Sequence, residues 1–119
     1  MDIDGRSDVG KVRSANEDEI AFNAEKGIAI LADGMGGLSA GDLASRTATA
    51  VVLESLTQAE QISEELLRNA IGLANDRVLA LSQLPASAAM GTTLVVWQDV
   101  GLGQCFIAHV GDSRAYRLR

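Results

Sequence analysis

Three short segments, far apart in the chain, place carboxylates beside arginine or glycine in patterns that could bind divalent cations and a phosphate group. In the first segment, Arg13 lies shortly before a run of three acids, Glu17-Asp18-Glu19. The rigid guanidinium fork matches phosphate oxygens, and neighbouring carboxylates can accept hydrogen bonds from metal-bound waters. A solvated charged loop with a surface ion pair worth less than about 1 kcal/mol is the alternative.

The second segment is Asp33 followed by Gly34-Met35-Gly36-Gly37, directly after an apolar run. A carboxylate at the end of a buried strand is costly unless something compensates its charge, and a metal ion is a good compensator. Glycine lets the backbone approach closely, so the carbonyl of Gly34 could join a shell of oxygen ligands. The alternative is a turn in which Asp33 caps the loop.

The third segment is His109-Val110-Gly111-Asp112-Ser113-Arg114, in which Asp112 sits at a turn after another apolar strand. An ordinary Gly-Asp hairpin turn is the alternative. We interpret His109 as a packed or supporting histidine and Cys105 as a buried structural cysteine, because no activating partner follows from the pattern. No phosphate-binding GxxxxGK[ST] loop and no GxSxG nucleophile elbow occurs.

The elements that must position these segments follow from hydrophobic periodicity. The apolar run from Gly27 to Ala32 predicts a buried strand, after which Gly34–Gly37 should break regular structure. Helical spacing predicts one helix from Ser39 or Gly41 to about Leu56 and a second from near Ser63 to before Pro85. The remaining predicted strands are Ile20–Phe22, Thr92–Gln98, Gln104–Val110 and Ala115–Arg119. Strands, two helices, then strands favour an α+β fold with antiparallel sheets.

Composition bounds the class of protein. The 119 residues carry 10 basic and 16 acidic side chains, a formal net charge of −6, so binding to a phosphate backbone is disfavoured and divalent cations are suited. The acidic N-terminus lacks an apolar signal core, no apolar run reaches membrane-spanning length, and the single cysteine suits a reducing compartment. We therefore expect a soluble cytoplasmic protein with no nucleic-acid or membrane partner.

Taken together, the segments resemble the PP2C (PPM) family of metal-dependent protein phosphatases, and its bacterial members most closely. The resemblance spans almost the whole chain in the family's order and spacing. The residues that carry it are Ser7-Asp8-Val9-Gly10-x-Val12-Arg13-x-x-Asn16-Glu17-Asp18, Ala32-Asp33-Gly34-Met35-Gly36-Gly37 with Ala40-Gly41, Met90-Gly91-Thr92-Thr93-Leu94, and Ala108-His109-Val110-Gly111-Asp112-Ser113-Arg114-Ala115-Tyr116.

The resemblance implies an α-β-β-α sandwich with antiparallel sheets and two long antiparallel helices, and a site for two or three Mn²⁺ or Mg²⁺ ions. It implies hydrolysis of phosphoserine and phosphothreonine in a protein substrate by a metal-bridging hydroxide, with a serine/threonine kinase as a family-level partner. By the match, Asp33 would bridge two metals and be catalytic, while the Gly34 carbonyl and Asp112 would also bind metal. Arg13 would hold the substrate phosphate, and Glu17 and Asp18 would contact metal-bound waters.

The chain departs from the family pattern in one respect, because the pattern stops after Asp112 and the family's later aspartates would lie beyond Arg119. We therefore expect residues 1–119 to form the N-terminal part of a single phosphatase domain that is inactive alone. A non-catalytic binding or regulatory module, and an unrelated α+β protein whose motifs are turns, are the alternatives. A cut sandwich exposes apolar sheet surface and strand edges, so the sequence also predicts dimerisation or strand swapping.

Overall fold

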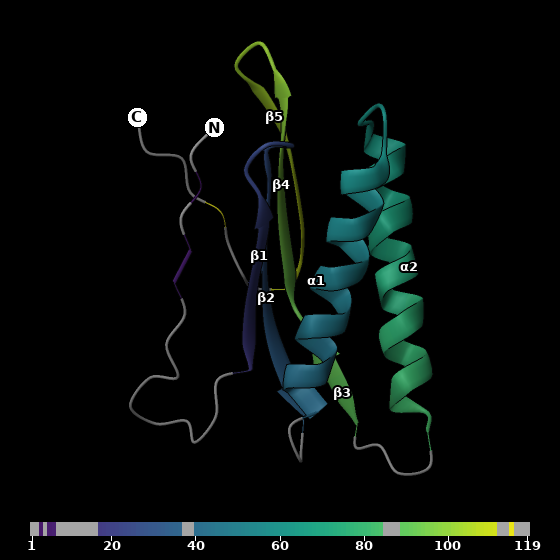
Figure 1. Ribbon diagram of the computed structural model, residues 1–119. Helices are drawn as coiled ribbons and strands as arrows, with labels where there is room; N and C mark the ends of the chain where they lie inside the picture. The colour runs from purple at the N-terminus through teal and green to yellow at the C-terminus, as the bar shows by residue number, and fades with distance from the viewer. Residues whose placement is uncertain are drawn as a thin grey trace.

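The computed structural model describes Ile3, Gly5, Arg6, Ala115 and the ranges 17–36, 40–84 and 89–111 (Figure 1). Its elements, in chain order, are β1 (Asp18–Asn23), β2 (Ile28–Gly36), α1 (Ala40–Gln58), α2 (Glu64–Ser82), β3 (Met90–Thr92), β4 (Leu94–Gly101) and β5 (Gln104–Val110). The succession of strands, two helices and strands confirms the predicted α+β class.

The strands form one antiparallel sheet in the order β1-β2-β4-β5, and β3 pairs with the end of β2. Residue Ile30 of β2 lies opposite Ala21 of β1 on one side and Val96 of β4 on the other. Strand β2 therefore lies inside the sheet, with hydrogen-bonded neighbours along both edges. The tight hairpin between β4 and β5 turns at Leu102 and Gly103, between the predicted strands Thr92–Gln98 and Gln104–Val110.

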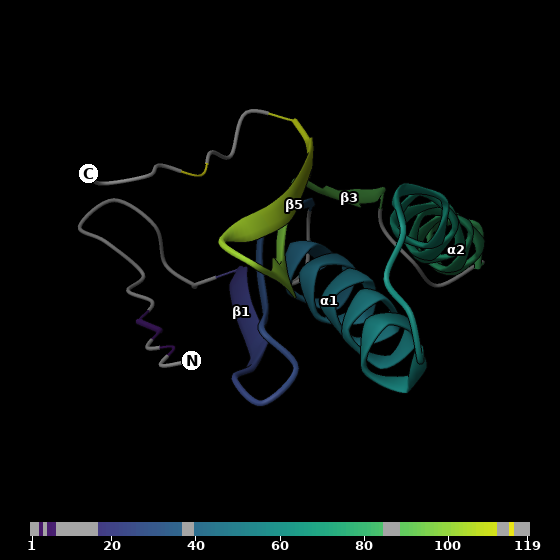
Figure 2. The ribbon, with the colours of Figure 1, turned by 90° about the horizontal axis from the view of Figure 1, so that it is seen from above.

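The helices cover one face of the sheet in two layers. Helix α1 packs directly on β2, β1 and β3, whereas α2 packs mainly on α1 and contacts the sheet chiefly at β3. Seen from above in Figure 2, α1 lies between the sheet and α2. Alternate residues of β2 point toward α1, and these are Ile28, Ile30, Ala32 and Gly34, all buried. The residues between them face the opposite side, which the helices leave open.

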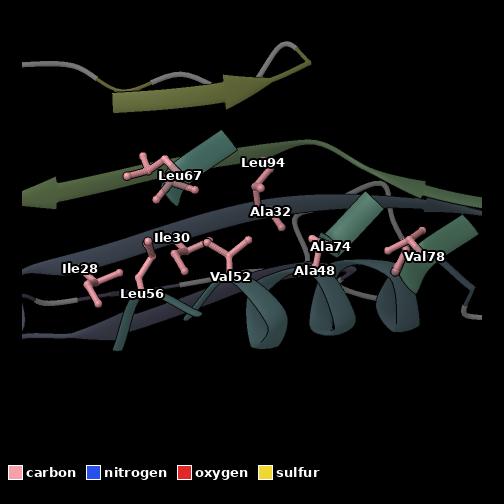
Figure 3. Packing of buried hydrophobic residues seen from close by; sticks show 12 residues of the cluster. Ile28, Ile30, Ala32, Ala48, Val52, Leu56, Leu67, Ala74, Val78 and Leu94 are labelled. Atoms are coloured by element: carbon pink, nitrogen blue, oxygen red, sulfur yellow. The ribbon is translucent and has the colours of Figure 1, made fainter. Parts of the chain in front are cut away.

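The hydrophobic core fills the space between β2, β4 and the two helices (Figure 3). It is built from small and aliphatic side chains, as the low aromatic content of 3% requires. Its members are Ile28, Ile30, Ala32, Ala44, Ala48, Val52, Leu56, Leu67, Ala74, Val78, Leu94 and Val96. Small alanines on α1 and α2 let the helix backbones approach the sheet and each other closely.

Both helices begin and end close to the predicted positions. The N-cap of α2 is Ser63, whose hydroxyl accepts a 3.1 Å hydrogen bond from the Leu66 amide, as its residue type and two following acids predicted. The buried face of α1 includes Ser45 and Thr49, which the apolar spacing did not select. Their burial costs little because each hydroxyl donates to a backbone carbonyl.

Several local predictions were wrong. Strand β2 continues through Gly34–Gly36, where a break was expected, because β3 supplies a partner strand from distant sequence. The single strand predicted from Thr92 to Gln98 is instead β3 and β4, separated at Thr93. Cys105 is exposed because strand alternation places it with Ile107 on the open face of the sheet, whereas Phe106 and Ala108 face the core. Ala115 lies outside any strand, and the rest of the strand predicted to Arg119 lies outside the described residues.

Among the described residues, no helix is both long enough and apolar enough to cross a membrane.

Replacing Ile30 by alanine should destabilise the protein by about 2–5 kcal/mol, because its side chain is 2% exposed and the rigid core would keep part of the cavity. Urea unfolding followed by circular dichroism measures the change. The matched control is Leu102→Ala at a fully exposed side chain, 100% exposed, where the same type of truncation should change stability little. Equal effects of the two substitutions would contradict the assigned core.

Candidate metal centre

The position of Asp33 follows from the alternation of β2. Ala32 and Gly34 on either side of it are buried beneath α1, so the side chain of Asp33 points to the open face of the sheet. The open face is thus where any ligand of this carboxylate would bind. It is reached at the end of the sheet where β2 leaves β4 and begins to pair with β3.

Asp18 lies directly opposite Asp33 on the neighbouring strand β1. Directly opposed residues on antiparallel strands have Cβ atoms about 4.5–5.5 Å apart and share a face of the sheet. Two carboxylates in this arrangement repel each other, and a shared cation relieves the repulsion. The pair therefore supplies hard oxygen donors, the kind that Mg²⁺ and Mn²⁺ prefer.

Thr93 holds Asp33 from the other side. The Asp33 amide donates a 3.1 Å hydrogen bond to the Thr93 hydroxyl, and the Thr93 amide donates a 2.9 Å bond to the Asp33 carbonyl. Thr93 is in turn close to Gly111, since a Cβ atom added to that glycine would lie 2.7 Å from the Thr93 methyl group. Asp18 of β1, Asp33 of β2, Thr93 between β3 and β4, and Gly111 directly after β5 thus form one row across the sheet, here called the site row.

Glu17 is fixed by the beginning of α1. Its carbonyl accepts a 3.1 Å bond from the Gly34 amide and a 2.7 Å bond from the Ser45 hydroxyl. A Cβ atom on Gly41 would collide with the Glu17 carboxylate, so this carboxylate lies against the first turn of α1. Negative charge is favourable at a helix N-terminus, where backbone amides have no partner within the helix.

Two glycines let α1 approach β2 this closely. The space that a side chain of Gly34 would need is occupied by the Gly41 carbonyl, and Gly41 in turn lies against the amide of Met35. The backbones of strand and helix are therefore in direct contact, one residue beyond Asp33. The physical need for glycine at these positions is the close approach of the two backbones.

The structure brings together four of the six predicted site residues. Asp18 and Asp33 face each other, and Glu17 is bonded to Gly34. Arg13 and Asp112 lie outside the described residues, so their predicted roles are untested. Within the described part of the chain, no three His, Cys, Asp or Glu side chains cluster tightly enough to hold an ion by themselves.

Sequence reasoning assigned no role to Thr93 or Ser45. Thr93 was part of the Met90–Leu94 motif, but its contact with Asp33 joins residues sixty positions apart. Ser45 could have been found as a polar residue flanked by small apolar ones on a helix, a position that needs a nearby acceptor when buried.

Comparison with known proteins decides the family, since the model for protein phosphatase 2C matches residues 9–119. The chain belongs to the protein phosphatase 2C family. It is 37% identical over 129 residues to the serine/threonine phosphatase Stp of Listeria monocytogenes, an alignment that covers 100% of this chain and 50% of that protein. It is 35% identical over 126 residues to the protein phosphatase PhpP of Streptococcus pneumoniae, covering 100% of this chain and 51% of that protein.

Solved structures agree with this family assignment. The catalytic domain of the serine/threonine protein phosphatase PstP, in complex with two manganese ions, superposes with a TM-score of 0.81 at 32% identity. The match covers 92% of this chain and 47% of that one. The fold is thus part of a protein phosphatase 2C domain, and the chain spans about half the length of the relatives it matches.

The close contact of Gly41 with Glu17 predicts that replacing glycine by alanine has opposite effects on stability at Gly41 of α1 and at Gly72 of α2. Gly41→Ala should destabilise the protein by about 1–3 kcal/mol, because its methyl group would displace the Glu17 carboxylate. Gly72→Ala, on α2 with no atom within 4 Å of the added Cβ, should stabilise by about 0.5–1 kcal/mol. Thermal or urea unfolding distinguishes them, and a stabilising Gly41→Ala would refute the contact.

Proposed function

We propose that this chain is part of a metal-dependent protein serine/threonine phosphatase, which hydrolyses phosphoserine and phosphothreonine in protein substrates. The observation that carries the proposal is the facing pair Asp18 and Asp33 at the edge of a protein phosphatase 2C fold. The named relatives are serine/threonine or protein phosphatases, and the superposed PstP domain binds two manganese ions. The expected cofactors are Mn²⁺ or Mg²⁺, two or three ions in the complete domain.

The residues present fit a divalent metal. Asp33 would hold the ions, the Gly34 carbonyl and Asp112 would add oxygen ligands, and Glu17 and Asp18 would accept hydrogen bonds from coordinated waters. When bound, the ions would lower the pKa of a water and neutralise charge on the phosphoryl group. Arg13 would orient the phosphate through two parallel hydrogen bonds. The site then needs no serine or cysteine nucleophile from the chain.

We further propose that residues 1–119 are the N-terminal part of one such domain and are inactive alone. The alignments support this proposal, because this chain covers about half of the length of each relative. The proposed setting is the cytoplasm, with a phosphorylated protein as substrate and a serine/threonine kinase as functional partner. Neither nucleic acid nor a membrane is expected to bind.

The metal role of Asp33 is tested in the complete phosphatase with p-nitrophenyl phosphate. Turnover should require Mn²⁺ or Mg²⁺, and Asp33→Asn should lower it on the order of 100-fold or more, because one shared metal ligand is lost. Asp76→Asn on the exposed side of α2 is the matched control and should leave turnover unchanged. Full activity of Asp33→Asn, or turnover without a divalent metal, would refute the proposal.

A non-catalytic binding or regulatory module is the second candidate function. It is favoured by one observation, that the described residues bring together only part of a metal ligand set. Calorimetry with Mn²⁺ and a turnover assay on the 119-residue chain separate the two cases. Turnover by the 119-residue chain would exclude the non-catalytic module. Turnover by the complete protein alone would not exclude it, because the isolated chain could still act only in binding or regulation.

The open face and edge of the sheet support a dimer of this chain. Phe22 of β1 and Ile107 of β5 are 45% and 53% exposed and lie at the two ends of one cross-strand row, with Ala29 and Trp97 between them. Gly5 lies against Phe22, which leaves the β5 end of the row the more open. Strand β5 carries no charged residue or proline, the devices by which edge strands avoid pairing with another chain.

We therefore expect light scattering to show a dimer, or a strand-swapped pair, at high protein concentration. Ile107→Lys should shift the protein to monomers, because an exposed charge on β5 opposes pairing. Leu79→Lys on α2, where the side chain is 52% exposed, is the control and should leave the dimer intact. A monomeric wild-type chain at high concentration would contradict the expected self-association.

A further inference from the structure

Thr93 interrupts the sheet in an unusual way beside Asp33. In a regular antiparallel pair, the Asp33 amide would donate to the carbonyl of its partner residue. Here it donates to the Thr93 hydroxyl at 3.1 Å, while the Thr93 carbonyl accepts a 2.8 Å bond from the Thr92 hydroxyl. The Thr93 hydroxyl thus takes the place of a backbone acceptor, and this replacement coincides with the break between β3 and β4.

The other branch of the same side chain lies against Gly111, the residue that follows β5. The Thr93 methyl group fills the space that a side chain at Gly111 would need, and Gly111 has a φ of 92°, which favours glycine. Gly111 directly precedes Asp112 in the sequence. Thr93 itself is 5% exposed, so neither branch is free to move into solvent. One small side chain therefore joins the ends of β2 and β5.

We propose that Thr93 is a positioning residue, which sets the direction of the Asp33 carboxylate and its spacing from Gly111. This inference rests on the metal role proposed for Asp33. A β-branched hydroxyl residue is needed because each branch has its own contact. Valine would keep the methyl contact with Gly111 and leave the Asp33 amide without its acceptor. Serine would keep the hydrogen bond and leave a gap against Gly111.

The geometric part of the inference is tested by amide hydrogen exchange, measured by NMR on the 119-residue chain without metal. Thr93→Val should make the Asp33 amide exchange at least about tenfold faster, as loss of a hydrogen bond worth about 1.4 kcal/mol would. Thr93→Ser should leave that amide protected. Thr49→Val is the matched control, since Thr49 is also buried but donates only to the Arg46 carbonyl within α1. It should not change exchange at Asp33.

Unchanged exchange at Asp33 in Thr93→Val would overturn the inference. If that variant does not fold, Thr93→Ala serves in its place, because it removes the hydroxyl without adding volume. The wild-type chain provides a further check that needs no variant. An Asp33 amide that exchanges as fast as an unstructured chain, in a protein otherwise folded, would also overturn the inference.

The functional part is tested by titrating the same variants with Mn²⁺ in the complete phosphatase. Thr93→Val should weaken binding by about 10-fold or more, the usual cost of losing a residue that orients a metal ligand, while Thr93→Ser should partly rescue it. Thr49→Val should bind as the wild type does. No Mn²⁺ binding by the wild-type complete phosphatase would count against the metal role of Asp33, with the exchange result still deciding whether Thr93 positions that residue. Equal affinity of wild type and Thr93→Val would overturn the positioning role.

Discussion

The packing of β2 is the constraint on which the rest of the structure depends. The strand is hydrogen-bonded to β1 along one edge and to β4 and then β3 along the other. Its alternate side chains Ile28, Ile30 and Ala32 are buried against α1, so the strand cannot rotate or slip by one residue without exposing all three. Because Asp33 continues the same strand, the core fixes the face on which its carboxylate appears.

The same constraint reaches α1 through backbone contact rather than through side chains. Gly34 and Gly41 bring strand and helix together immediately after Asp33, and Ser45 ties the helix to the Glu17 carbonyl. Protein interiors are close-packed and transmit small displacements, so a shift of α1 would move both Glu17 and the end of β2. The helix thus belongs to the support of the carboxylates as much as to the core, which explains why a polar serine is buried in its sheet-facing side.

The sequence allowed prediction of those features that arise from local chemistry. Ser63 and its acidic first turn marked the start of α2, and the apolar run before Asp33 marked β2. What could not be predicted depends on pairing between distant segments. The Gly34–Gly36 segment is a strand only because Met90–Thr92 pairs with it. Glycine is disfavoured in strands and has no side chain to form an alternating pattern, so nothing in the sequence indicated this pairing. For the candidate site, the carboxylates were found from their motifs, but Thr93 gained a role only from its place beside Asp33 in the folded sheet.

The two faces of the sheet differ in how completely the helices cover them, and this difference affects how firmly the Asp33 carboxylate is positioned. Helix α1 covers one face of β2, whereas α2 contacts the sheet chiefly at β3 and leaves a cavity of about 350 Å³ lined by residues that include Ile71, Met90 and Leu94. On the opposite face, the apolar side chains of Phe22 and Ile107 are about half exposed. The site row lies at the end of that open face, and within it Asp33 and Thr93 are bonded to each other through the Thr93 hydroxyl and through their backbones. Because Ala32 and Gly34 are buried beneath α1, the direction of the Asp33 carboxylate is set by the packing of β2 against that helix.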